Sequence, residues 1–420
     1  MTRLGPNRQA MKVVIINRSD ALGGAAIASA RLCLGLLKAG ADARMLVLDR
    51  RTGSDRVQAV GSKAMNRWRF LAERGGIFLR NGLRRRTLFL IDTATHGVNL
   101  TKHPWVGQAD VIVLGWVNQA MLSLGDVRHI ASLGKPVVWV MHDMWNCTGV
   151  CHHAGTCEEF LSSCEACPLL PSGSRLAQRT WQRKRDLYAQ SPITFVAVSR
   201  WLERKCRESA LMGDARIRMI PNAIDVSQFA HTSLTGNPWQ VEPDRKVAVM
   251  GAARLDTPGK GFDRLTAALH WLAQNQPDVA RRLHLVLYGS LRDHSLLNSI
   301  PIPYTYLGYV TDLQQIYRHA HIVVCASDFE SFGFTLIEGM ACGCVAVTTG
   351  EGGQTDIVSH RKNGYITADL RPESLAEGLA WAVLNERQRE AQHNWVAQHF
   401  ALETIAKQHL QLYQQLLPSP

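Results

Sequence analysis

The 420-residue chain has no run of about 18 consecutive apolar residues, so we expect no transmembrane helix. Its first ten residues, MTRLGPNRQA, lack the apolar core of a secretory signal peptide. It has no low-complexity tract, and 46% of its residues are hydrophobic against 20% charged, which argues against a largely disordered protein. These absences predict a folded protein of the cytosol, where cysteines are more often thiols or metal ligands than disulfides.

Acidic residues are almost missing from residues 63–90, where eight Lys and Arg residues stand against one acid, Glu73. The segment therefore carries +7 of the chain's net charge of +12. Apolar residues such as Trp68 and Phe70 are interleaved with the cations, and a stretch of this kind can lie in a membrane interface and attract anionic lipid. A plain solvated helix face is the alternative. We expect no nucleic-acid partner, because no nucleic-acid-binding motif occurs elsewhere.

Short apolar runs alternate with helical patterns along the chain, which is typical of α/β proteins with parallel, doubly wound sheets. Strands are expected at 12–17, 43–48, 111–116, 136–141, 193–198, 246–252, 283–289, 304–308, 321–327 and 345–349. The length predicts two domains. We predict two Rossmann-like domains that face each other across a cleft, at 11–217 and 218–390, with C-terminal helices at 391–420 that could return to the first domain.

The segment ESFGFTLIE, residues 330–338, follows an expected strand and opens an expected helix. A helix N-terminus offers backbone N–H groups to an anion. Here these groups would belong to Gly333, Phe334, Thr335 and Leu336. Glu330 and Glu338 flank them with carboxylates that can accept hydrogen bonds from hydroxyl groups. Phosphates between two sugars, as in a nucleotide sugar, fit this order; a capped surface helix with incidental acids is the plainer alternative.

The segment GAARLDTPGKGFDRL, residues 251–265, places Arg254 and Lys260 around a Pro-Gly turn before a helix. Two cations at the mouth of a cleft would neutralise a diphosphate, and each charge-assisted hydrogen bond shielded from water contributes about 1.5–3 kcal/mol. The same cations would stabilise a departing diphosphate, which helps the transition state as well as binding. Taken alone, the pair is also compatible with ordinary surface charge.

Four motifs in this order resemble a retaining GT-B glycosyltransferase of family four, the glycosyl transferases group 1. They are the two glutamates of ESFGFTLIE, Arg254 with Lys260, PNAID at 221–225 and NGYI at 363–366. The resemblance covers about residues 11–415 and implies the GT-B fold. The Cys-rich insertion at 147–168 resembles a subgroup that builds capsule, exopolysaccharide and lipopolysaccharide chains.

The resemblance implies a role for each matching residue of the second domain. Glu330 would contact the hydroxyl groups of the donor sugar, and Glu338 would accept from those of the ribose. Arg254 and Lys260 would hold the diphosphate, together with the backbone N–H groups of residues 333–336.

Other donor contacts follow from the same resemblance. The nucleobase would lie near Gly308, Tyr309 and Val310, mostly on backbone. In ALGGAA, Gly23 and Gly24 would let the backbone approach the donor phosphate closely. The chain has no lone Asp-x-Asp motif where a metal-dependent GT-A enzyme would need one, so no cofactor or divalent ion is expected for the transfer itself.

His142, in MHDMW, follows an expected buried strand and should therefore point from the strand's carboxyl end into the cleft. A lone histidine is usually structural, but the resemblance implies one here that contacts the donor sugar near the reacting carbon. Asp143 would orient it or cap the next turn. The sequence offers no obvious nucleophile, so the resemblance implies front-face attack by the acceptor hydroxyl, whose proton passes to the leaving phosphate oxygen.

The insertion after His142 holds five cysteines within 21 residues. Cys151, Cys157, Cys164 and Cys167 supply four thiols, and a Cys-x2-Cys knuckle with two further ligands is a common tetrahedral zinc site. We expect a structural zinc ion that fixes this loop on the acceptor side of the cleft. Free thiols, disulfides and an iron–sulfur cluster are the alternatives.

The sequence therefore predicts a cytoplasmic glycosyltransferase, peripheral on the inner face of the cell membrane. It would move a sugar from a nucleotide-diphosphate sugar to a lipid-linked saccharide acceptor, with retention at the anomeric carbon. This reaction would belong to the synthesis of cell-surface polysaccharide. The rival prediction is a catalytically inactive GT-B-like protein that binds a nucleotide sugar or a saccharide and carries a structural metal clip.

Overall fold

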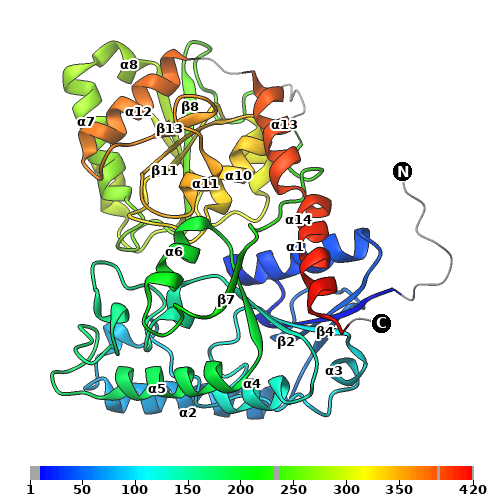
Figure 1. The fold of residues 1–420 in the computed structure, drawn as a ribbon. Coiled ribbons are helices and arrows are strands. Elements are labelled where there is room, and N and C mark those ends of the chain that lie inside the picture. Colours follow the sequence, from blue (N-terminus) through cyan, green and yellow to red (C-terminus); the bar gives the residue numbers. More distant parts are fainter. Residues whose placement is uncertain (1–9, 231–235, 386–387, 419–420) are drawn as a thin grey trace. The chain divides into compact units, whose positions relative to one another are not determined.

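The computed structural model describes residues 10–230, 236–385 and 388–418, so the expectation for the N-terminal segment lies outside these ranges. The chain divides into two compact units, the first made of residues 1–223 with 402–420 and the second of residues 224–401. Each unit is a parallel sheet with helices, which confirms the predicted α/β class (Figure 1). No helix in the described ranges is long and apolar enough to cross a membrane.

The first unit holds a seven-stranded parallel sheet. In spatial order its strands are β3 (Val57–Ala59), β2 (Asp42–Asp49), β1 (Lys12–Ser19), β4 (Val111–Leu114), β5 (Val137–Met141), β6 (Ile193–Ala197) and β7 (Arg216–Met219). Apolar runs such as VIVL at 111–114 are buried along their whole length, as central strands covered by helices on both faces must be. The strand order reverses between β1 and β4, so this is the switch point at which doubly wound sheets bind ligands.

The C-terminal helix belongs to the first unit although it follows the second in sequence. The helices of this unit are α1 (Gly24–Lys38), α2 (Lys63–Arg80), η1 (Arg85–Thr87), α3 (Pro104–Gln108), α4 (Leu124–Ala131), η2 (Met144–Cys147), η3 (Glu159–Leu161), α5 (Leu176–Gln190), α6 (Arg200–Glu208) and α14 (Leu402–Leu416). Helix α14 packs on α1, and Gly35 allows this because a Cβ there would lie 2.8 Å from the carbonyl oxygen of Leu402.

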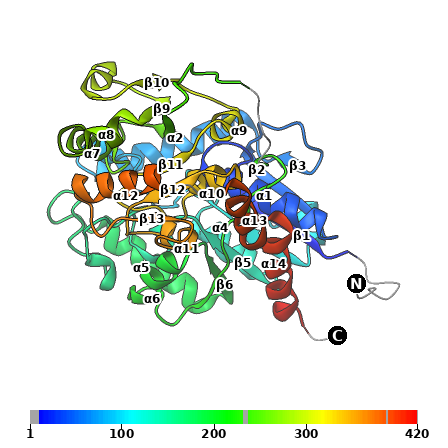
Figure 2. The ribbon, with the colours of Figure 1, turned by 90° about the horizontal axis from the view of Figure 1, so that it is seen from above.

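The second unit holds a six-stranded parallel sheet. In spatial order its strands are β10 (Tyr304–Tyr306), β9 (Leu283–Ser290), β8 (Lys246–Arg254), β11 (Ile322–Cys325), β12 (Val345–Thr348) and β13 (Gly364–Ile366). Its helices are α7 (Phe262–Asn275), α8 (Pro277–Arg281), η4 (His294–Ser299), α9 (Leu313–Arg318), α10 (Phe334–Ala341), α11 (Gln354–Ile357), α12 (Pro372–Leu384) and α13 (Arg389–Phe400). Helices α7 and α12 lie side by side over one face of the sheet (Figure 2). Here the strand order reverses between β8 and β11.

The boundary between the units lies a few residues later than the sequence suggests. Residues 216–219, RIRM, form edge strand β7 of the first sheet, so a division at 217/218 would cut through a strand. The units divide after Ala223. An edge strand with alternating exposed and buried residues has no continuous apolar run, which is why no strand was expected at this segment.

Candidate functional site

Two loops meet at the switch point of the second sheet, one after β8 and one after β11. Gly261 directly precedes α7 with a φ of +76°, and a Cβ on it would collide with the carbonyl oxygen of Ala326. The backbone N–H of Asp328 donates to the carbonyl of Gly259 at 2.8 Å. The loop of RLDTPGKG and the loop that precedes ESFGFTLIE are therefore in direct contact.

This contact brings two predicted site residues together. Lys260 Nζ lies 2.6 Å from Glu330 Oε1, and the hydroxyl of Ser327 donates to the same oxygen at 2.8 Å. Burial alone would lower the pKa of Lys260, but the Glu330 carboxylate and its hydrogen bond raise it above its ordinary value. The ammonium is therefore charged, and it stands where a doubly wound sheet receives its ligand.

The backbone of Glu330 is held by a residue that the sequence did not single out. The Glu330 N–H donates to Gln354 Oε1 at 3.1 Å, and Gln354 Nε2 donates to the hydroxyl of Thr349 at 3.0 Å. Gly352, with a φ of +117°, leaves no room for a side chain because a Cβ would collide with the Glu330 backbone. A signal does exist in the sequence: a glycine-rich turn, GEGGQTD, directly follows the strand VAVTT.

The second predicted cation, Arg254, is the last residue of β8 and has a different partner. Its Nε lies 3.0 Å from Asp256 Oδ1. A third cation, Arg264, was not predicted. It pairs with Asp328 at 2.6 Å and donates to the carbonyl of Ala326, and so fixes the loop after β11.

The segment ESFGFTLIE forms the expected turn into a helix. Gly333 has a φ of +114° and precedes α10. The amide of Leu336 donates to the Gly333 carbonyl at 3.1 Å, so in this structure it is engaged within the first turn. Glu338 is buried in α10, beside the paired hydroxyls of Tyr288 and Tyr317, which lie 2.6 Å apart. Burial, and then the Glu338 charge, raise the pKa of Tyr288, so the pair stays protonated.

The predicted nucleobase loop follows the carboxyl end of β10, as the loops after β8 and β11 follow the carboxyl ends of their strands. The Gly308 carbonyl accepts a hydrogen bond from the N–H of Gly289, at the end of β9, at 2.6 Å. The Tyr309 side chain is 76% exposed, and Val310 is half-buried. This loop therefore offers an accessible aromatic ring, while contact with a base stays a prediction.

The remaining predicted donor residues belong to the first unit. Gly23 precedes α1 with a φ of +86°, a conformation that favours glycine, and Gly24 is the first residue of that helix. Both follow β1, one of the two strands at the switch point of the first sheet. The open backbone that the sequence predicted at this helix start is present, and its ligand stays a prediction.

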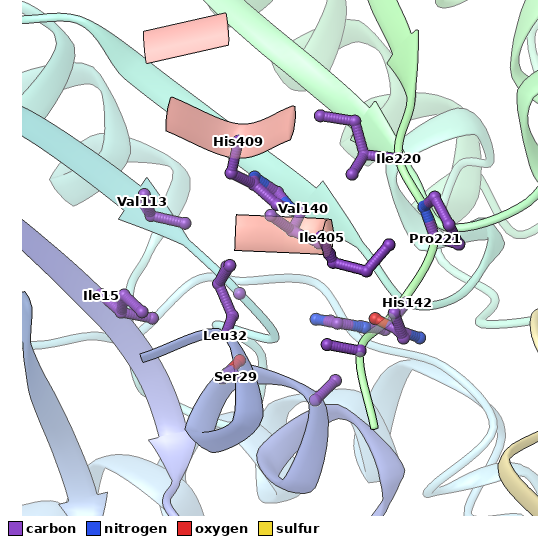
Figure 3. Close-up of a pocket in the computed structure, with 14 residues that line it drawn as sticks. Ile15, Ser29, Leu32, Val113, Val140, His142, Ile220, Pro221, Ile405 and His409 are labelled. Atoms are coloured by element: carbon purple, nitrogen blue, oxygen red, sulfur yellow. The ribbon is translucent and has the colours of Figure 1, made fainter. Parts of the chain in front are cut away.

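His142 directly follows β5 and lines a small pocket inside the first unit (Figure 3). His409 of α14 lines the same pocket. His142 is half-buried, and its Nε2 is enclosed without a hydrogen-bond partner among the described residues. Burial lowers the pKa of His142 to about 4 against an opposing effect of Asp143, and burial with the neighbouring His142 lowers that of His409 to about 3. Both imidazoles are therefore neutral at neutral pH.

Of the two roles expected for Asp143, the structure shows the cap. Its carboxylate accepts from the N–H of Trp145 at 2.8 Å and from Trp116 Nε1 at 2.9 Å. His152 Nδ1 lies 2.8 Å from Asp143 Oδ2, the oxygen that also accepts from Trp116. Burial alone would lower the pKa of His152, but the Asp143 carboxylate outweighs this and raises it. Asp143 thus ties the loop after β5 to the loop after β4.

A buried lysine that sequence reasoning missed holds the same loop. Lys184 Nζ donates to the carbonyls of Trp145 and, at 3.1 Å, of Thr148, and it lies 3.4 Å from the centre of the Trp145 ring. Burial lowers the pKa of Lys184 to about 7. Within LAQRTWQRKRDLYAQ a single lysine resembles a solvent-facing residue, so the sequence gives no signal for it.

The four cysteines of the predicted zinc site line one cavity of about 60 Å³. They are Cys151, Cys157, Cys164 and Cys167, and all four are free thiols. Burial raises the pKa of Cys151 to about 12 and of Cys164 to about 11, so these thiols are protonated. Among the described residues no group of three or more His, Cys, Asp or Glu side chains is arranged to hold a metal ion. The zinc ion stays a prediction.

Comparison with known proteins gives relatives for both sequence and fold. The model of the family "Glycosyl transferases group 1" matches residues 238–399. A phosphatidyl-myo-inositol mannosyltransferase of Mycobacterium tuberculosis is 30% identical over 228 residues, 51% of this chain and 57% of that protein. The chain spans about a quarter to a little over half the length of the curated relatives it matches.

Solved structures match almost the whole chain. A glycosyltransferase from Rickettsia africae superposes with a TM-score of 0.65 at 14% identity, covering 98% of this chain and all of that one. Anabaena HepE in complex with UDP-glucose superposes with a TM-score of 0.59 at 15% identity, covering 97% and 100%. Residues 238–399 thus carry the sequence pattern of glycosyl transferases group 1, and the chain as a whole has the GT-B fold.

Proposed function

We propose that the protein transfers a sugar from a nucleotide-diphosphate sugar to a saccharide acceptor, with retention at the anomeric carbon. The observation that carries this proposal is the pair of Lys260 and Glu330 at the switch point between β8 and β11. A cation and a carboxylate at this point match the two chemical parts of such a donor, an anionic diphosphate and a sugar with hydroxyl groups.

The pair suggests how the donor would be received. Lys260 is charged, and its ammonium forms an ion pair with Glu330 while no donor is bound. A diphosphate carries more negative charge than one carboxylate, so it would draw Lys260 away and release Glu330 for the hydroxyl groups of the sugar. Arg254, at the end of the neighbouring strand β8, supplies a second cation. Both cations would then stabilise the diphosphate as it leaves.

We propose no protein nucleophile. The acceptor hydroxyl would attack on the face from which the diphosphate leaves, and its proton would pass to the departing phosphate oxygen. The bond from the anomeric carbon to that oxygen breaks as the new glycosidic bond forms, so the step needs no cofactor or divalent ion.

The acceptor belongs to the same proposal. A relative named as a mannosyltransferase of phosphatidyl-myo-inositol and the Cys-rich insertion both support a saccharide acceptor that is lipid-linked. The work would then be done in the cytoplasm at the inner face of the cell membrane, in the synthesis of cell-surface polysaccharide. A structural zinc ion in the insertion is part of this proposal: four thiols around one cavity supply enough ligands, provided that they lose their protons and close in.

The test is calorimetry with UDP-, GDP-, ADP-, dTDP- and CMP-linked sugars on the wild type, on Glu338→Ala and on Glu377→Ala. Glu377 is an exposed acid of α12 and serves as the matched control. We expect one class of donor to bind the wild type and the control and to bind Glu338→Ala at least tenfold more weakly. If no donor binds the wild type, the proposed function is wrong. Donor binding without turnover of any saccharide acceptor would favour the inactive binding protein.

A further inference from the structure

The segment 63–90, which contains α2 and η1, exposes an unusual number of large apolar side chains. We call it the α2 surface. The exposed apolar residues are Met65, Trp68, Leu71, Leu79, Leu83, Phe89 and Leu90. Trp68 is 60% exposed and Leu79 is 72% exposed. Exposed apolar side chains gathered in one segment of a folded protein point to a site of interaction.

The exposed residues of α2 form a stripe along the helix. Trp68, Leu71 and Leu79 follow one another at intervals of three and eight residues, which places them on one side of a helix with 3.6 residues per turn. The opposite side is buried and carries Glu73, Arg74 and Ile77. The helix thus turns its apolar stripe outward and its charged pair inward, the reverse of an ordinary surface helix.

The buried pair explains why this arrangement is stable. Arg74 lies 2.5 Å from Asp92 and 3.4 Å from Glu73, and it also donates to the carbonyls of Leu88 and Ile91. These bonds fasten α2 to the segment that follows η1. They also remove the one acid of residues 63–90 from the surface, because Glu73 is buried.

The exposed charge of the α2 surface is therefore of one sign. Its exposed cations are Lys63, Arg67, Arg80, Arg84, Arg85 and Arg86. Cations that flank an outward apolar stripe, with no exposed acid among them, complement a layer of anionic headgroups above acyl chains. A nucleic acid would use the cations but would leave Leu71 and Leu79 in water.

We infer that the α2 surface binds the surface of an anionic lipid bilayer. The stripe would enter the boundary between headgroups and acyl chains, and the arginines around η1 would contact the headgroups. This inference gives a place to the lipid-linked acceptor of the proposed function, but it rests on the exposure and charge of residues 63–90 and not on the donor site.

The first experiment is sedimentation of the full chain with vesicles of phosphatidylcholine alone and with 30 mol% phosphatidylglycerol. We expect binding to the anionic vesicles only, weaker at higher salt. Replacing Arg84, Arg85 and Arg86 together by Gln should weaken it on the order of 100-fold, since each cation near such a surface contributes roughly a factor of five. The control replaces Arg204, Arg281 and Arg371 by Gln. These exposed cations lie outside the α2 surface, and their replacement changes the net charge equally.

The second variant, Trp68→Ser with Leu79→Ser, leaves the charge intact and tests the apolar stripe. We expect it to weaken binding at least tenfold, with the circular dichroism and the thermal midpoint of the wild type as the check on folding. The inference is overturned if wild type does not sediment with anionic vesicles, or if the control triple loses as much binding as the arginine triple. It is also overturned if RNA displaces the vesicles at stoichiometric amounts. Calorimetry of the donor on both variants separates this result from the proposed function, since donor affinity should not change.

Discussion

Breaking the Lys260–Glu330 pair from each side should affect the two halves of the donor differently. Lys260→Met removes one cation from the diphosphate site. Each charge-assisted hydrogen bond to a phosphate contributes about 1.5–3 kcal/mol, so we expect the dissociation constant to rise roughly 10- to 150-fold. Because the diphosphate is common to both ligands, the loss should be the same for the nucleoside diphosphate and for the nucleotide sugar.

Glu330→Gln should separate the same two ligands. In the free protein the Glu330 carboxylate competes with the diphosphate for Lys260, at 2.6 Å. Its neutralisation should leave the nucleoside diphosphate bound as well as before, or a few-fold better. The nucleotide sugar should bind about 10-fold more weakly, because hydrogen bonds from sugar hydroxyls to a charged acceptor are lost.

Loss of folding does not account for either result. The Lys260 and Glu330 side chains are 36% and 25% exposed, and a pair so accessible to water contributes at most about 1 kcal/mol to the free energy of unfolding. Calorimetry with both ligands on wild type, the two single variants and the double variant measures the coupling. The reasoning is refuted if Lys260→Met binds the nucleoside diphosphate within twofold of the wild type. It is refuted equally if Glu330→Gln weakens both ligands to the same degree.

Three further predictions concern stability and positioning. The folded-state pKa of His409 lies below its unfolded value, so the contribution of His409 to the free energy of unfolding is complete above pH 6.5 and is lost as the pH falls. At pH 5.5 this loss is about 1 kcal/mol. Urea unfolding at pH 7.5 and 5.5 should show a smaller loss in His409→Gln but not in His129→Gln, which alters an exposed residue of α4. Gln354→Ala should free the backbone of Glu330 and lower turnover about tenfold with a smaller effect on diphosphate affinity, and kinetics equal to the wild type would contradict that role. Cys164→Ser should lose bound zinc that the wild type retains, measured by emission spectrometry with Cys33→Ser as the control; a wild type purified without metal would remove the zinc site.

The strands were predictable where they are buried on both faces. Runs such as KVVIIN and HIVVCAS identify β1 and β11 because central parallel strands are nearly continuous runs of apolar residues. The edge strands β3, β7 and β13 have only three or four residues, so they gave no such run, whereas the edge strand β10 overlaps the expected strand at 304–308. The order of the strands, and with it the switch point, follows from which strands pair, and pairing between distant segments leaves no mark in a local pattern.

The candidate site was predictable to the extent that its chemistry is local. Lys260 and Glu330 each stand in a short segment whose glycines and charges indicate a turn before a helix. That the two meet depends on the close approach of Gly261 to Ala326, which no spacing reveals. The burial of Lys184 could not be predicted from any local pattern. It depends on contacts with backbone carbonyls of a loop that precedes Lys184 by more than 30 residues.

The pocket around His142 shows how far the first unit depends on distant parts of the chain. Ile15 of β1, Leu32 of α1, and Ile405 and His409 of α14 all line it, so its wall joins the first strand to the last helix (Figure 3). The whole second unit lies between them in sequence. The surroundings of His142 are therefore complete only after the second unit has been synthesised. A domain cut from the chain at residue 223 would lack this wall.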